Sequence, residues 1–186
     1  MLVLHDWGSA FGLDWARRHE KCVRGLVLME FITRFPTWLD FPERGRERFK
    51  AFRAPGTGVE RIIEKNEFVE QILPASIVRP LSDVEMKEYR APFLEPKHRE
   101  PTWRFPNELP IAGEPVDVYA MATAYEQWLL ETDLPKLFFW DSPGGPDFRG
   151  KSCMVRATSA QLQSDLRRRR SALHPGGPSS PRWQRH

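Results

Sequence analysis

The sequence predicts an α/β fold in which helices flank a parallel sheet, and three apolar segments lead to this prediction. Residues 1–4 form a short apolar run, and helical periodicity follows from Ala10. Residues 26–29 form a second apolar run, and residues 136–140 form a third after a long helical pattern at 116–130. Short apolar runs that alternate with helical patterns are typical of parallel βαβ units.

The first predicted strand ends at Asp6, two residues before Gly8. α/β-Hydrolases hold their nucleophile on a sharp turn of this kind, which lifts the side chain above the edge of the sheet. We expect glycine at position 8 because a Cβ there would collide with the tight turn. A carboxylate that attacks carbon forms an alkyl ester, so Asp6 favours displacement at a saturated carbon. The alternative is that Asp6 caps an ordinary helix, since Asp is a preferred N-cap residue.

The second predicted strand ends at another acid, Glu30. Because active sites of α/β proteins lie at the carboxyl ends of the strands, Asp6 and Glu30 are expected at the same edge of the sheet. Glu30 can then orient a histidine from elsewhere, as the acid of a nucleophile–base–acid triad does. The alternative is a solvated loop glutamate, which is the commoner role of a single Glu.

The pattern of residues 36–115 predicts short helices that are broken by proline. Charged side chains are expected on their solvent-facing sides and aromatic side chains on their buried sides. Helical periodicity is present at 44–52 and 60–73, and Ser82 and Glu85 form a capping box that opens another short helix. We therefore expect a partial sheet with a helical cap, and we divide the chain into four consecutive parts. These parts are 1–35 (core with both acids), 36–115 (cap), 116–144 (core helix and strand) and 145–186 (aberrant basic tail).

Matches to one known family run along most of the chain. They include His-Asp-Trp-Gly-Ser-Ala at 5–10 and the long run Trp-Arg-Phe-Pro-Asn-Glu-Leu-Pro-Ile-Ala-Gly-Glu-Pro at 103–115. Further matches lie at 29–32, 36–38, 49–53, 66–70, 73–74, 78–82, 89–93, 99–101 and 134–137. Through these residues the segment 3–140 resembles the haloalkane dehalogenases, which are α/β-hydrolases with a helical cap.

The resemblance implies a role for each matched site residue. Asp6 matches the nucleophile that displaces halide, Trp7 matches the indole donor that holds the leaving halide, and Glu30 matches the acid that supports the catalytic histidine. An apolar, halogen-bearing substrate suits a dry cavity between cap and core. The residues that match the lining of this pocket are Phe41, Phe49, Phe52, Phe68, Ile72, Phe105 and Leu109. For each of these side chains, plain core packing is the alternative role.

The resemblance also implies parts that this sequence lacks. The family has strands before the nucleophile strand, a loop that supplies a second halide donor, often Asn, and a histidine base far downstream. His5 directly precedes the nucleophile and is not the expected base. His174 and His186 follow no predicted strand that could place them. We therefore expect a chain truncated at its N-terminus that does not turn over as written.

The basic tail has two explanations. Residues 141–186 carry nine Lys and Arg against three Asp and Glu, and their Pro, Gly and Ser content predicts disorder. Such a tail is typical of a nucleic-acid-binding or targeting arm. However, synonymous codons for 145–148 and 172–179, read one nucleotide later, encode segments that resemble the family's continuation and the region of its base. We hypothesise that one extra nucleotide near Gly144 or Gly145 has put the tail out of frame.

Composition bears on whether the protein is a membrane protein, a secreted protein or a metal-binding protein. No apolar run reaches membrane-spanning length, no signal-peptide pattern is present, and Cys22 and Cys153 have no metal-type spacing. We expect a cytoplasmic protein without cofactor or metal. Its expected partners are a small halogenated hydrocarbon, water and halide ion, with no membrane and no specific nucleic acid.

Other functions stay open at the level of sequence. One is a non-catalytic product, such as a pseudoenzyme or a binding protein that uses the basic tail. The others are an epoxide hydrolase or a luciferase of the same fold. Epoxide hydrolases place tyrosines in the cap to protonate the opening oxide, and Tyr89 is the only tyrosine between residues 36 and 115. Tyr89 lies at a position that the dehalogenases share.

Overall fold

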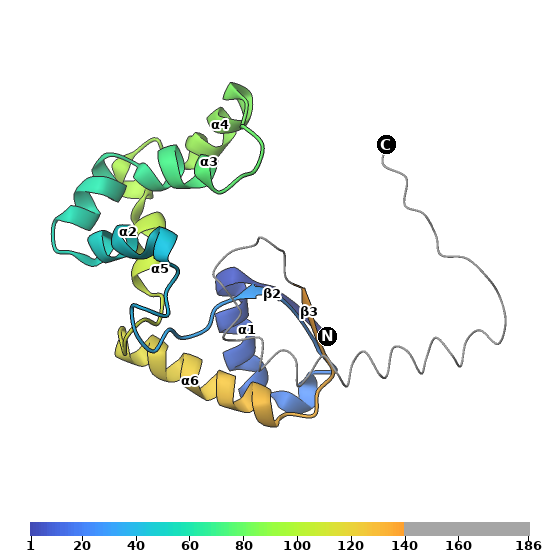
Figure 1. Cartoon of the computed structure of the whole chain (residues 1–186). Helices are drawn as coiled ribbons and strands as arrows, with labels where there is room; N and C mark the ends of the chain where they lie inside the picture. The colour runs from blue at the N-terminus through green and yellow to red at the C-terminus, as the bar shows by residue number, and fades with distance from the viewer. Residues whose placement is uncertain (140–186) are drawn as a thin grey trace, which may run out of the picture.

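The computed structural model describes residues 1–139 of the 186-residue chain. Within these residues, β1 (Leu2–His5), β2 (Leu26–Phe31) and β3 (Lys136–Phe139) form a parallel sheet in the order β1-β2-β3. All three strands point the same way in Figure 1, so that their carboxyl ends share one edge. The predicted α/β class and the parallel sheet are confirmed.

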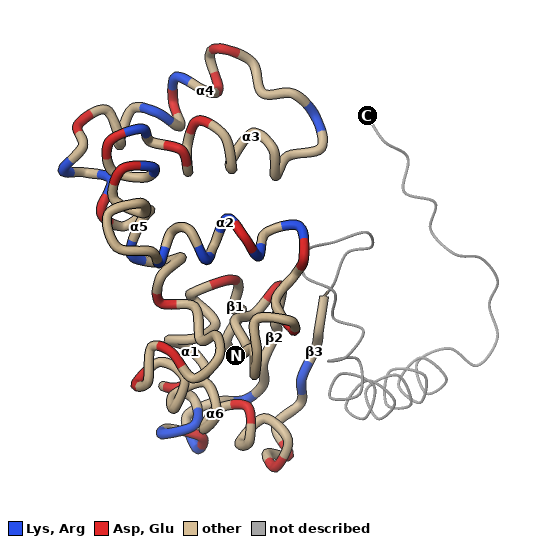
Figure 2. The backbone as a smooth tube through the Cα atoms, turned by 60° about the vertical axis from the view of Figure 1, so that its left-hand side comes forward, with Lys and Arg blue, Asp and Glu red and all other residues tan. Residues whose placement is uncertain are grey.

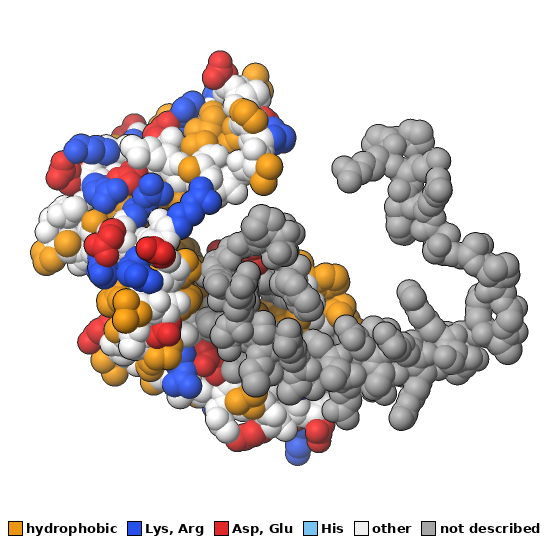
Figure 3. Space-filling view, viewed as in Figure 1, with side chains coloured by type: hydrophobic (Ala, Val, Ile, Leu, Met, Phe, Trp, Pro, Cys, Tyr) orange, Lys and Arg blue, Asp and Glu red, His pale blue; other side chains and the backbone are white. Residues whose placement is uncertain are grey.

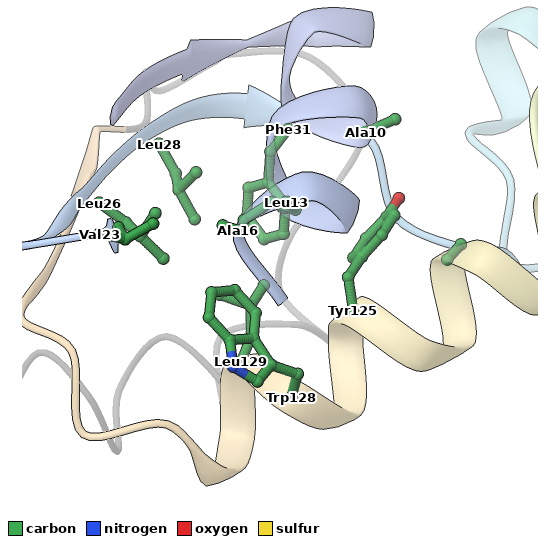
Figure 4. Close-up of a cluster of buried hydrophobic side chains, with 11 residues drawn as sticks. Ala10, Leu13, Ala16, Val23, Leu26, Leu28, Phe31, Tyr125, Trp128 and Leu129 are labelled. Carbon is green, nitrogen blue, oxygen red and sulfur yellow. The ribbon is translucent and has the colours of Figure 1, made fainter. Parts of the chain in front are cut away.

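Helices α1 (Asp6–Arg18) and α6 (Val116–Glu131) cover one face of the sheet. Burial alternates along β2, where Leu26 and Leu28 are almost completely buried. Figure 4 shows these two side chains beside Leu13 of α1, with Tyr125 of α6 also facing α1. Between α1 and β2 lies the short helix η1 (Glu20–Cys22). The main core is therefore the layer between the sheet and these helices.

The opposite face of the sheet is apolar and exposed within residues 1–139. Val3 is 63% exposed and Phe139 is 54% exposed, and Leu137 also lies on this side. Helices normally cover both faces of a parallel sheet. Within residues 1–139, helices α1 and α6 cover only one face of this sheet.

Between β2 and α6 the chain forms short helices that stand apart from the sheet (Figure 1). They are α2 (Glu43–Arg53), η2 (Val59–Glu64), η3 (Phe68–Ile72), α3 (Leu73–Ala75), α4 (Asp83–Arg90), η4 (Ala91–Phe93), η5 (Pro96–His98) and α5 (Glu100–Asn107). Acidic and basic residues are interspersed along them (Figure 2), and both signs share the visible surface (Figure 3). These helices lie within the expected cap at 36–115, and we call residues 36–110, which contain them, the helical cap.

The two ends of the cap lie side by side. Phe35 N–H donates to the carbonyl of Pro110 at 2.8 Å, and Ala112 N–H donates to the carbonyl of Phe35 at 2.8 Å. Phe35 and Ile111 form a small buried cluster at this point. The cluster also contains Phe41, Trp38, Phe49 and Leu109. Entry and exit of the cap are thereby joined by both backbone bonds and apolar packing.

Arginine side chains bind the turns of the cap together. The Arg99 guanidinium donates to the carbonyl of Phe93 at 2.7 Å and to that of Ile63 at 2.8 Å. Arg61 makes two hydrogen bonds of 2.5 Å to the buried carboxylate of Glu67. The Arg99 contacts satisfy backbone carbonyls that short helices leave without helical partners, and the Arg61 contacts neutralise a buried carboxylate.

The predicted helix at 60–73 is not continuous. The chain forms η2 and η3, which are π-type turns, and Asn66 between them has φ 53°. Asn tolerates this left-handed backbone better than most residues, and apolar periodicity does not report such a break. The capping box is confirmed: Glu85 N–H donates to Ser82 Oγ at 3.3 Å, and Ser82 N–H donates to the Glu85 carboxylate at 2.9 Å.

Some predictions lie outside the described residues. These are the disordered basic tail at 145–186, the change of frame near Gly144, and the end of the predicted third strand at Trp140. Among residues 1–139, no helix combines the length and the apolar character that crossing a membrane requires.

Candidate active site

Asp6 lies where β1 turns into α1 and has φ 47°. A residue with a Cβ adopts this left-handed backbone at a cost of about 1–3 kcal/mol, so the surroundings must enforce it. An N-cap residue has extended backbone, and here that position is His5, with φ −141°. Asp6 is therefore on a sharp elbow, and the ordinary N-cap interpretation does not describe it.

The predicted reason for Gly8 is wrong. A Cβ built at Gly8 meets no heavy atom of the described chain within 4 Å. The close approach occurs instead at Gly12, where a Cβ would lie 2.5 Å from a Leu4 side-chain carbon. The close approach lies one turn later than we expected, at the point where α1 packs against the Leu4 side chain of β1.

Glu30 follows the same backbone pattern on the neighbouring strand. It lies near the end of β2 with φ 40°, and the next residue, Phe31, forms a parallel bridge with Asp6. Two left-handed acidic residues therefore lie at the carboxyl ends of adjacent strands, at one edge of the sheet. This is the juxtaposition that the sequence predicted.

His5 lies beside both acids. Its Nε2 is 3.5 Å from Oε2 of Glu30, and both side chains are more than half exposed. Desolvation raises the pKa of the Asp6 carboxyl above its ordinary value, although solvent still reaches the side chain. His5 and the Trp7 backbone N–H act in the opposite direction on this pKa, whereas the charge of Glu30 raises it further. Sequence reasoning did not anticipate the contact between His5 and Glu30.

Trp7 joins the elbow to the cap. Its ring centroid is 5.6 Å from that of Phe105 in α5 and 6.2 Å from that of Phe11 in α1. Phe105 is 43% exposed, so this part of the surface is only partly closed. The predicted halide donor and one predicted pocket residue are therefore neighbours.

The other predicted pocket residues divide into two groups. Phe41, Phe49 and Phe52 form a row of tilted rings with centroids 5.0 and 5.7 Å apart, and Leu109 packs against Phe41 and its neighbours. Phe68 and Ile72 are half-buried in η3, which packs against α3 and α4. Figure 1 shows α3 and α4 in the part of the cap farthest from the sheet.

Ser9 is a site residue that sequence reasoning missed. Its side chain is completely buried, its hydroxyl donates to the Asp6 carbonyl at 2.5 Å, and it accepts the Ile32 N–H at 2.8 Å. The sequence shows only a small polar residue three positions after Asp6, at the start of an apolar helix face. A serine at this position is equally compatible with the exposed surface of the helix. Only its hydrogen bond to Ile32, directly after β2, shows that Ser9 is a buried site residue.

The site offers carboxylates but no metal centre among the described residues. No group of three or more His, Cys, Asp or Glu side chains within 1–139 could hold a metal ion. What the arrangement provides is a carboxylate on a strained turn, a second carboxylate one strand away, and an indole next to the first.

Solved and curated proteins share this architecture, although no model of a protein family matches the chain. A haloalkane dehalogenase from Sphingobium indicum is 50% identical over 145 residues, which are 77% of this chain and 49% of that protein. The crystal structure of an ancestral haloalkane dehalogenase has a TM-score of 0.72 at 51% identity and covers 76% of this chain and 50% of its own. The haloalkane dehalogenase DbeA from Bradyrhizobium elkani gives 0.72 at 48% identity, with the same two shares.

The parallel sheet, the acidic elbow and the cap place the chain among the α/β-hydrolases. The chain spans about half the length of the curated relatives that it matches. Over that span it belongs to the haloalkane dehalogenase family, which is a family of hydrolases. The resemblance seen in the sequence is thereby confirmed.

Proposed function

We propose that the chain carries out the alkyl-transfer half of hydrolytic dehalogenation. A carboxylate oxygen of Asp6 attacks the halogen-bearing carbon, a carbon–oxygen bond forms, and the carbon–halogen bond breaks. The halide leaves with the electron pair, and the product is an alkyl ester on Asp6. The observation that carries this proposal is the Asp6 carboxylate on a left-handed elbow, with the Trp7 indole adjacent to it in sequence.

Trp7 and the pocket side chains have supporting roles in this proposal. The indole N–H of Trp7 holds the departing halide, which develops negative charge during the displacement. Phe105, in ring contact with Trp7, forms one wall of the substrate site, and the half-buried Phe49 and Leu109 form another, which the buried rings of Phe41 and Phe52 support. Phe68 and Ile72 are proposed to act farther out in the cap, where longer alkyl chains reach.

The second half of the reaction needs a base. Water must attack the ester carbonyl while a base accepts its proton, after which alcohol leaves and the Asp6 carboxylate is restored. In the family pattern, Glu30 orients that base. Within residues 1–139 the histidine beside Glu30 is His5, which the family pattern does not use as the base. We propose that the 186-residue chain stops at the alkyl ester.

The decisive experiment measures a covalent product in a single turnover. The 186-residue chain is incubated with 1-bromohexane, and intact mass spectrometry follows addition of one hexyl group while halide release is titrated. We expect one hexyl group and one bromide per chain, with the adduct on the peptide that contains Asp6. Asp6→Asn should abolish both signals, because a neutral amide is a far weaker nucleophile.

A matched control removes the same charge from the same helix. Asp14 lies on α1 and is paired with Arg17 and Arg18, away from the elbow. Asp14→Asn should therefore keep the hexyl adduct. An unmodified wild-type chain, or an adduct that persists in Asp6→Asn, would contradict the proposed function.

A further inference from the structure

Ser9 connects the two acidic strand ends through a single buried hydroxyl. The hydroxyl has one proton, which it donates to the Asp6 carbonyl, and its lone pair accepts the N–H of Ile32. Asp6 belongs to the elbow, and Ile32 comes two residues after Glu30. The two partners therefore directly follow β1 and β2, the neighbouring strands at whose carboxyl ends the proposed chemistry takes place.

Both acids need external support for their backbone conformation. Asp6 has φ 47° and Glu30 has φ 40°, and left-handed residues with a side chain persist only where their surroundings fix them. We propose that Ser9 is a positioning residue that fixes the Asp6 carboxylate relative to Glu30. This inference rests on the proposed function, because it assigns Ser9 a role in the reaction of Asp6.

A second hydroxyl binds the same residue, Ile32, through its other backbone group. Tyr125, completely buried on α6, donates its Oη proton to the carbonyl of Ile32 at 2.8 Å. The segment after Glu30 is thus held through its N–H by α1 and through its carbonyl by α6. Ser9 is the member of this chain of contacts that touches the nucleophile residue itself.

The expected effect is on the rate of reaction rather than on binding. Ser9 is buried beneath the elbow and makes its hydrogen bonds to backbone groups, so its removal leaves the pocket side chains unchanged. Ser9→Ala removes one partner from the Asp6 carbonyl and one from the Ile32 N–H, so that the elbow keeps its parallel bridge to Phe31 but loses its side-chain link to the segment after β2. A misplaced reacting group lowers a rate by roughly 10- to 100-fold.

The test uses the 186-residue chain with 1-bromohexane, and the rate of hexyl addition is measured over a range of substrate concentrations. We expect Ser9→Ala to lower the maximal rate of addition by about 10- to 100-fold and to leave the half-saturating concentration within about twofold. The matched control is Ser76→Ala, because the Ser76 hydroxyl also donates to a backbone carbonyl, that of Ile72 at 2.7 Å, but in the cap. Ser76→Ala should react like the wild type.

Amide hydrogen exchange at Ile32 provides a readout that does not depend on reactivity. Exchange should be slow in the wild type and in Ser76→Ala, and faster in Ser9→Ala, while urea unfolding verifies that each variant is folded. A folded Ser9→Ala variant with the wild-type rate of addition would overturn the positioning role and leave the proposed function standing. A wild type that takes up no hexyl group would overturn the proposed function, and the Ile32 exchange rates then still decide whether Ser9 holds the two strand ends together.

Discussion

The elbow region and the helical cap are held in place by different means. At the elbow, Asp6 and Glu30 are positioned by backbone, through left-handed φ values, a parallel bridge and the Ser9 hydroxyl. In the cap, aromatic side chains are positioned by packing on each other and by arginine contacts between short helices. The proposed reactive groups thus depend on backbone geometry, and the side chains proposed to shape the pocket depend on side-chain packing. Substitutions in the two regions should therefore fail in different ways.

The largest expected effect tests whether packing is what holds the cap. Phe52 is 1% exposed and its ring contacts Phe49, so Phe52→Ala should lower the free energy of unfolding by about 3–5 kcal/mol. Phe105, which is 43% exposed, is the matched aromatic control, and Phe105→Ala should cost much less. Urea unfolding measures both. Equal losses for the two variants would show that burial does not set the stability of the cap.

The second prediction separates chemistry from packing at the elbow. Trp7→Leu should slow hexyl addition about 10²-fold, because one donor to a developing charge is lost, and should also remove the quenching of indole fluorescence by bromide. Trp15 is the control on the same helix, since it is 41% exposed and stacks on His19. Trp15→Leu should react normally. A normal rate in Trp7→Leu would make Trp7 a packing residue only.

A third pair of substitutions tests the closeness of α1 to β1. Gly12→Ala should be less stable than Gly8→Ala by about 1–3 kcal/mol, because the Leu4 side chain must move away from the new methyl group. Gly8→Ala should be neutral or slightly stabilising, since nothing in the described chain meets its Cβ and alanine favours a helix. Thermal unfolding distinguishes them. The opposite ranking would restore the original expectation for Gly8.

The smallest expected effect concerns pH. The ionised form of Asp6 is the nucleophile and its pKa is raised, so the rate of hexyl addition should reach half its maximum at a pH above 3.8. Glu30→Gln should move this midpoint down, because the charge of Glu30 raises the pKa of Asp6. The rate–pH profile of each variant, measured by mass spectrometry, checks the direction. A midpoint that rises in Glu30→Gln would contradict the proximity of the two acids.

The same pKa has a consequence for stability. The folded state holds the Asp6 proton more tightly than the unfolded state, so the stabilisation from this group is present at low pH and is lost as pH rises through the folded pKa. Asp6→Asn should remove this pH dependence of unfolding. This measurement needs no substrate, and it therefore tests the electrostatics of the elbow separately from the reaction.

Local patterns in the sequence determined the order of strands and helices, the two acids at strand ends and the capping box at Ser82. These features depend on residues a few positions apart, so periodicity and spacing report them directly. The matches at 5–10 and 103–115 also identified the family, because long ordered runs of residues rarely coincide by chance.

Tertiary structure decided what depends on distant neighbours. The close contact at position 12 comes from Leu4 on the packed strand, and the break at Asn66 is visible only in the folded backbone, where φ is 53°. Ser9 became a site residue only because Ile32, 23 positions later, lies next to it. Close approach and buried hydrogen bonds are made between elements, and no pattern within one element records the partner that the other supplies.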